Sequence, residues 1–199
     1  MIRILDCKNP NYLSRLKLIL NKRRFKSKIN TDIVIKIVKD IKKNKKKALL
    51  KYEKKFSKNA KIKPTKKEIN KSIKSLDPKI KNAIDFAYSR ILKFHSLQKN
   101  KNIKYVDKQN NKIEYRYIPI QSVGIYVPSN LPSTLLMNAI LAKKIAGVKR
   151  VVLANPRLNG KLNPAVMYAA RKCGISEIIS AGGSQAIASL AYIQKVNKI

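Results

Sequence analysis

Apolar residues recur at helical spacing through the first hundred residues of the chain. They form stripes at Val34, Ile37, Val38 and Ile41, at Leu49, Tyr52 and Phe56, and at Ile80, Ile84, Ala87, Ile91 and Phe94. Such stripes predict helices that bury one face. Thr31 is placed to cap the first of these helices, and a Lys-Asn break near Asn44 separates it from the second.

Two further helix starts in this region have specific capping signals. The run from Thr65 to Glu68 has the spacing of a capping box and is followed by Ile69, Ile73 and Leu76 at helical intervals. Asp77 with Pro78 gives an N-cap followed by proline in the first turn. Residues 1–111 therefore read as a mostly helical N-terminal region.

The pattern changes near Lys112, where Ile113, Tyr115 and Tyr117 alternate with polar residues as in a half-exposed strand. Beyond it, three short apolar strands alternate with three helices. The expected strands are Val123–Val127, Lys149–Ala154 and Glu177–Ser180, and the expected helices are Pro132–Ala146, one from Pro164 to just before Gly174, and Ser184–Tyr192. Alternation of this kind predicts right-handed crossovers and a parallel sheet. The predicted fold is α/β, a Rossmann-like parallel sheet in residues 112–199 with helices on both faces, preceded by the helical N-terminal arm. We expect residues 112–199 to be an incomplete domain of this kind.

Ligands of open parallel sheets bind beyond the carboxyl ends of the strands. Two segments fall at such ends, namely Tyr126–Asn130 and Ala181–Gln185. Two glycines before a helix let the backbone approach a ligand, and free N–H groups there favour an anion such as a phosphate. A tight structural turn explains Gly182-Gly183 equally well, and the segment matches neither the G-x-G-x-x-G fingerprint nor a P-loop.

The net charge of +36 is spread along the chain, with 36 of the 46 basic residues in residues 1–120 and 10 in residues 121–199. Nucleic-acid binding is one interpretation of this charge. We expect no specific nucleic-acid function, because the basic residues lie on helix faces that need solvation and there is no aromatic RNA-binding motif. The most apolar window, Leu135–Ala142, is too short to span a membrane. Cys7 and Cys173 are far apart in sequence, which fits a reducing cytoplasm.

Three motifs resemble the first half of the histidinol dehydrogenases. They are V-G-I-Y-V-P at Val123–Pro128, P-S-T-L-L-M-N-A-I at Pro132–Ile140 and A-G-G-S-Q-A-I-A-S-L-A-Y at Ala181–Tyr192. The resemblance implies that Tyr126 and Gln185 contact NAD. The chain departs from the family pattern at Ser129-Asn130, where a Gly-Gly pair is usual. The segment before Pro132 is also a few residues shorter than in the family.

The resemblance also implies an activity, the oxidation of L-histidinol through the aldehyde to L-histidine with NAD, in a zinc-dependent homodimer when the polypeptide is complete. The family's zinc ligands and acid-base pair are expected beyond Ile199. Residues 121–199 contain one acid, Glu177, and no histidine, and His95 is the single histidine of the chain. Proton transfer needs a matched pair of such groups. We therefore expect the 199-residue chain alone to be inactive and to bind no zinc, with no catalytic or metal-ligating residue in it. The alternatives are a non-catalytic nucleotide- or partner-binding module, or a basic nucleic-acid-associated protein.

Overall fold

The computed structural model describes residues 5–194, with the backbone alone for residues 22–30. Its centre is a parallel sheet in the order β3-β4-β5, formed by Ser122–Tyr126, Arg150–Ala154 and Glu177–Ile179. Tyr126 is paired with Ala154, and Ala154 with Ile179, so the carboxyl ends of the three strands meet at one edge. The three strand predictions are confirmed to within one or two residues.

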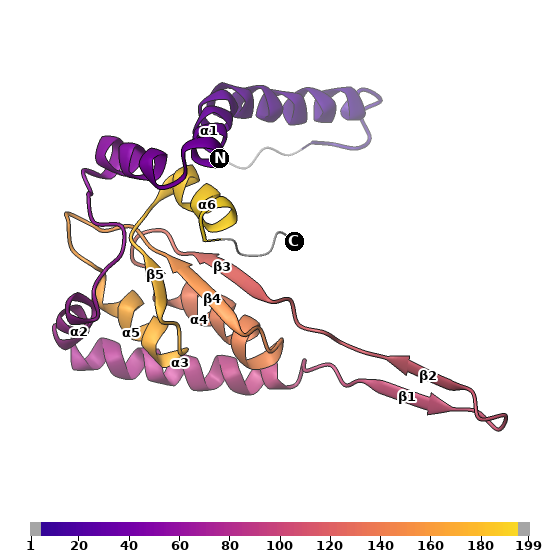
Figure 1. Cartoon of the computed structure of the whole chain (residues 1–199). Helices are drawn as coiled ribbons and strands as arrows, with labels where there is room; N and C mark the ends of the chain where they lie inside the picture. Colours follow the sequence, from indigo (N-terminus) through magenta and orange to yellow (C-terminus); the bar gives the residue numbers. More distant parts are fainter. Residues whose placement is uncertain (1–4, 195–199) are drawn as a thin grey trace.

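Successive side chains of the central strand β4 point to opposite faces of the sheet, as the period of a strand requires. Val151 and Leu153 pack with helices α2 (Lys66–Lys74), α3 (Pro78–Ser96), α4 (Pro132–Ile140) and α5 (Pro164–Lys172). Val152 and Ala154 pack instead with α1 (Tyr12–Ser57) and α6 (Gly183–Tyr192). The sheet is thus enclosed between two layers of helices (Figure 1).

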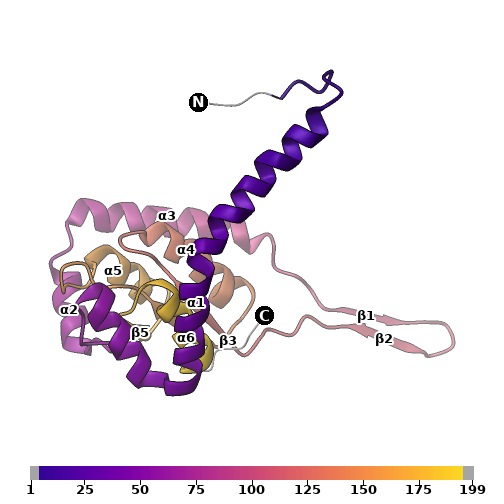
Figure 2. The ribbon, with the colours of Figure 1, turned by 90° about the horizontal axis from the view of Figure 1, so that it is seen from above.

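Helix α1 is longer than the sequence predicts. It begins at Tyr12 and ends at Ser57, so Thr31 lies inside it and the prediction of a cap at Thr31 is wrong. No glycine or proline interrupts residues 12–30, and the helix therefore continues through Thr31. The predicted break near Asn44 is confirmed, because Lys45 has non-helical angles of φ 48° and ψ −126°. The N-terminal part of α1 extends away from the body of the molecule (Figure 2), whereas Ile37 and Ile41, just before the kink, are buried against it.

The other helix boundaries follow their local signals. Thr65 and Glu68 form the predicted capping box, and the Asp77 carboxylate accepts a hydrogen bond from the Lys79 N–H. Asn163 caps α5 in the same way. Helix α4 continues into one π-helical turn, η1 (Leu141–Ile145), before Gly147 takes a left-handed φ of 73°. Across residues 5–194, every helix is too short or too polar to span a lipid bilayer.

A hairpin of β1 (Ile103–Val106) and β2 (Lys112–Tyr115) projects from the body on the side away from α2 (Figures 1 and 2). The two strands pair antiparallel, with Tyr105 opposite Ile113. Strand β1 was not predicted, and the boundary placed at residues 111 and 112 falls inside the hairpin. The strand predicted from Lys112 is confirmed as β2, but its expected half-burial is wrong, because all residues of both strands are exposed. Within residues 5–194, no layer packs against either face of the hairpin.

Candidate functional site

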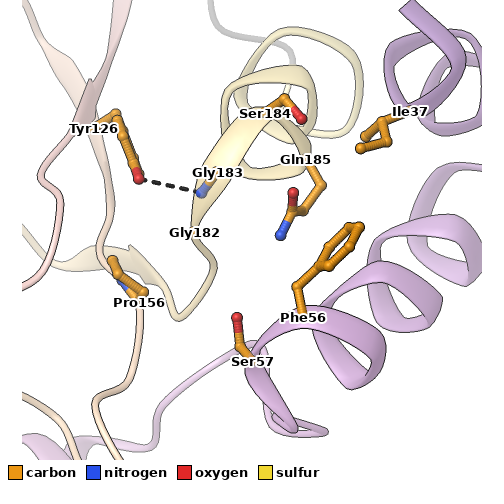
Figure 3. A pocket seen from close by; sticks show the side chains of 9 residues that line it. All are labelled: Ile37, Phe56, Ser57, Tyr126, Pro156, Gly182, Gly183, Ser184 and Gln185. Atoms are coloured by element: carbon orange, nitrogen blue, oxygen red, sulfur yellow. Dashed lines mark hydrogen bonds between the residues drawn. The ribbon is translucent and has the colours of Figure 1, made fainter. Parts of the chain in front are cut away.

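A pocket of about 400 Å³ opens at the carboxyl edge of the sheet (Figure 3). Its walls come from the ends of β3 and β4, the turn before α6, and helix α1. The lining residues are Ile37, Phe56, Ser57, Tyr126, Pro156, Gly182, Gly183, Ser184 and Gln185. Both sequence-predicted site residues, Tyr126 and Gln185, are therefore in one pocket.

Tyr126 is the last residue of β3, and its half-buried side chain reaches across the pocket to the start of α6. Its phenolic oxygen accepts a hydrogen bond from the Gly183 N–H, at 3.1 Å (Figure 3). This contact closes one wall of the pocket and fixes the phenol, while the flat side of a tyrosine ring offers a stacking surface.

Gln185 lies in the first turn of α6 and is 4% exposed. Its Nε2 donates a hydrogen bond to Glu53 Oε1, at 2.9 Å. The opposite end of the carboxamide lies beside Gly183, where an added Cβ would come within 2.9 Å of Gln185 Oε1. Gly183 also has a φ of 58°, which disfavours other residues. The glycine therefore leaves room for the carboxamide oxygen, an acceptor that takes no hydrogen bond from the described residues.

Glu53 is the site residue that sequence reasoning missed. It is fully buried near the end of α1, and its Oε1 accepts hydrogen bonds from the Gly182 N–H, at 3.0 Å, and from Gln185. Since a carboxylate can only accept, this contact fixes which end of the Gln185 amide is the nitrogen. The available signal was the spacing from Leu49, because an acid four residues after a stripe residue lies on the buried face.

The N-terminus of α6 already has hydrogen-bond acceptors within the protein. Gly182 donates to the Glu53 carboxylate and Gly183 donates to Tyr126, so two of the N–H groups predicted to be free for a phosphate are occupied. These two contacts favour the alternative interpretation, that Gly182-Gly183 forms a tight structural turn. The pocket instead offers a phenol and an amide oxygen, which suit an uncharged polar group.

The loop after β3 is held in place by Asn155, the residue that follows β4. Asn155 is fully buried, and its Nδ2 donates to the carbonyl oxygens of Val127 and Ser129, both at 2.9 Å. Ser129 has a left-handed φ of 50°, and neither it nor Asn130 lines the pocket. Asn155 is a second residue that the sequence did not single out.

Within residues 5–194, no three His, Cys, Asp or Glu side chains are grouped so that they could hold a metal ion. His95 Nδ1 is 2.6 Å from Gln98 Oε1 at the end of α3. Cys173 is buried, and burial raises the pKa of its thiol to about 11, which opposes the thiolate that zinc requires. The described residues do not fit a zinc site.

These features define an α/β protein with a pocket beyond the carboxyl ends of a parallel sheet, where proteins of this class bind their ligands. The histidinol dehydrogenase family model matches residues 20–199, and the chain belongs to this family. It is 58% identical to the histidinol dehydrogenase of Pelagibacter ubique, over all of this chain and 48% of that protein. It is 35% identical to the Caulobacter vibrioides enzyme, over 96% of this chain and 46% of that protein.

Among solved structures, the histidinol dehydrogenase of Elizabethkingia anophelis has a similar fold. The TM-score is 0.77 at 35% identity, and the match covers 85% of this chain and 40% of that one. The chain thus spans about half the length of the relatives that it matches most fully.

Proposed function

We propose that this chain is the NAD-facing part of a histidinol dehydrogenase and that the pocket between Tyr126 and Gln185 receives the dinucleotide. The observation that carries the proposal is the convergence of these two residues, 59 positions apart in sequence, on one pocket at the carboxyl edge of the sheet. That edge is where parallel sheets of the Rossmann-like class bind nucleotides.

The residues that line the pocket can bind a ligand and orient it. Tyr126 supplies a ring face, and Gln185 supplies an amide oxygen held in place by Glu53. A ribose hydroxyl or a carboxamide N–H is the kind of donor that this oxygen accepts. At about 400 Å³, the pocket is suited to one part of a dinucleotide.

The proposed reaction of the complete protein is the two-step oxidation of L-histidinol to L-histidine through the aldehyde. NAD, when bound, accepts the hydride in each oxidation. Among the described residues that line the pocket, Tyr126 is the single ionisable one. Proton transfer therefore needs groups outside this pocket. A homodimer in the cytoplasm is part of the same proposal and rests on family membership.

The binding proposal is tested by titrating the 199-residue chain with NAD in a calorimeter. Tyr126→Ala removes the ring, Tyr126→Phe removes the hydroxyl alone, and Gln185→Ala removes the amide. We expect each to weaken NAD binding, with Tyr126→Ala the most severe at about tenfold or more. Tyr117→Phe, on an exposed tyrosine outside the pocket, is the control. Equal affinities for Tyr126→Ala and the parent chain would remove the pocket from consideration.

The catalytic part of the proposal needs a longer polypeptide. Residues 1–199 joined to the remaining half of the Pelagibacter ubique enzyme should reduce NAD in the presence of L-histidinol. The same hybrid with Gln185→Ala should need more NAD for half-maximal rate. The 199-residue chain should give no reduction above background, and turnover by this chain alone would show that the proton-transferring groups are already within it.

A further inference from the structure

A second cavity, of about 780 Å³, lies between α2 and the loop that joins β4 to α5. Helix α2 contributes Glu68, Lys71, Ser72 and Ser75, and the loop with the start of α5 contributes Arg157, Leu158, Asn159, Gly160, Lys161, Leu162, Asn163 and Pro164. Cavities of this size are typical of small-molecule sites. It is separate from the proposed NAD pocket, although Pro156 lines that pocket and Arg157 follows it directly.

The loop wall of this cavity is a preformed turn. Leu158 and Lys161 exchange two backbone hydrogen bonds of 3.0 Å, and Asn159 and Gly160 between them have φ angles of 50° and 74°. Two positive φ values in a two-residue loop are typical of a tight hairpin turn. The Ser72 hydroxyl donates to the Leu162 carbonyl oxygen, at 3.3 Å, and links the loop to α2. The site therefore needs little reorganisation to accept a ligand.

Arg157 is the central cation of the cavity. Its side chain is 6% exposed, yet its partners are distant, because Glu68 Oε1 is 3.4 Å away and the Gly160 carbonyl oxygen is 3.3 Å away. Its Nε is buried and has no hydrogen-bond partner among the described residues. A buried guanidinium carries five N–H donors in a planar fork that matches phosphate and carboxylate oxygens. These contacts leave most of that capacity unused.

The charge balance of the lining is positive. Lys71, Lys161 and Arg157 face one carboxylate, Glu68. The backbone N–H of Thr65 donates to that carboxylate at 2.8 Å and is the main cause of the lowered pKa of Glu68. Because Glu68 serves the cap of α2, it cannot also neutralise three cations.

We propose that this cavity binds a small phosphorylated metabolite, with Arg157 as the principal phosphate ligand and Lys71 and Lys161 as flanking charges. The described lining residues include no aromatic ring on which a base could stack, and the apolar ones are Leu158, Leu162 and Pro164. The non-phosphate part of the ligand is therefore aliphatic or sugar-like. This site is independent of the proposed NAD pocket and of the dehydrogenase activity.

The test is calorimetric titration of the full chain with inorganic phosphate, at constant ionic strength maintained with chloride. Constant ionic strength is needed because a chain of net charge +36 attracts any anion. Lys71→Ala and Lys74→Ala form a matched pair, since both lysines are exposed on α2 and Lys71 alone lines the cavity. We expect about threefold weaker binding for Lys71→Ala, no change for Lys74→Ala, and about tenfold or greater loss for Arg157→Gln, which removes a charged hydrogen bond.

Equal weakening by Lys71→Ala and Lys74→Ala would overturn the proposal, because phosphate would then respond to overall charge. If Arg157→Gln lowers the melting temperature markedly, the Lys71 and Lys74 pair still decides the outcome. Glycerol 3-phosphate and adenosine 5′-monophosphate distinguish the ligand class. The proposal is supported if glycerol 3-phosphate binds at least as tightly as inorganic phosphate. It is contradicted if only adenosine 5′-monophosphate binds more tightly than inorganic phosphate.

Discussion

Glu53 illustrates how a single buried residue sets the geometry of the proposed NAD pocket. Its Oε1 accepts two hydrogen bonds, while its Oε2 is buried and has no partner within the described part of the chain. Replacing Glu53 with alanine leaves the Gly182 N–H and the Gln185 amide without an acceptor, and each orphaned donor costs about 1–3 kcal/mol. Replacing it with glutamine keeps an acceptor oxygen at the same position.

We therefore expect Glu53→Ala to lower the free energy of unfolding by about 3 kcal/mol and Glu53→Gln by about 1 kcal/mol, measured by urea titration. Lys54→Ala, on the neighbouring exposed residue, is the control and should change little. If alanine and glutamine at position 53 have the same effect, the hydrogen bonds to Gly182 and Gln185 are not what Glu53 contributes.

The two cysteines should differ sharply in reactivity. Cys7 is exposed, whereas Cys173 is buried and burial raises its thiol pKa to about 11. The thiolate is the reactive form, so Cys173 should be inert at pH 8. We expect one thiol per chain to react rapidly with a chromogenic disulfide reagent, and two after unfolding in guanidinium chloride. Two rapid thiols in the folded chain would contradict the burial of Cys173.

At the residue scale, sequence reasoning placed Tyr126 and Gln185 at the same edge of the sheet, because Tyr126 ends one recognisable strand and Gln185 follows another. It could not bring Glu53 or Asn155 to the site. Glu53 contacts residues 129 and 132 positions away, and Asn155 holds a loop 26 to 28 positions earlier. The pattern of neighbouring residues in the sequence does not identify such partners, because the packing of whole helices and strands brings them together.

At the element scale, the starts of β4 and β5 are joined by an ion pair. Arg150 Nε and Nη2 bond the two Glu177 oxygens, at 2.9 and 2.7 Å. The hydrogen bond from Arg150 is the main cause of the lowered pKa of Glu177. Because the folded-state pKa lies below the unfolded one, this stabilisation is present at neutral pH and is lost as the pH falls through the folded-state pKa.

Glu177→Gln should accordingly lower stability at pH 7 by less than about 1 kcal/mol, since both side chains are more than a third exposed and solvent screens the pair. The difference in the free energy of unfolding between parent and variant, measured by urea titration, should become smaller below pH 4.5, the ordinary pKa of glutamate. It should also narrow in 1 M salt. A gap that widens in acid would show that the two charges do not stabilise the fold.

Prediction of the elements from sequence succeeded where burial imposes a pattern. Strand β4 is apolar on both faces, as a strand between two helical layers must be. Strand β1 is four residues long and exposed on both faces, so its sequence pattern could not be distinguished from that of a polar linker. The hydrogen-bonded partner that makes it a strand lies across a turn, at Lys112–Tyr115.

At the scale of the whole molecule, the β1–β2 hairpin presents apolar side chains to solvent. Tyr105 and Ile113 are directly opposed and are 57% and 62% exposed. Exposed strand pairs with apolar side chains promote association between chains. Replacing both residues with threonine keeps a strand-forming side chain and removes the apolar surface.

We expect Tyr105→Thr with Ile113→Thr to reduce concentration-dependent association, measured by sedimentation velocity over a tenfold range of protein concentration. The matched control is Lys104→Thr with Glu114→Thr, the opposed pair next to it on the same two strands. If the control pair has the same effect, the shape of the hairpin and not its apolar surface is responsible.

The packing of α1 against α6 also has a consequence for how the protein is made. Glu53 leaves the ribosome long before Gln185, 132 residues later, which at about 10 residues per second is a delay of roughly 13 seconds. During that interval Ile37, Ile41 and Leu49 have no α6 to cover them. The proposed NAD pocket can therefore form only after Gln185 has been synthesised and α6 has packed against α1.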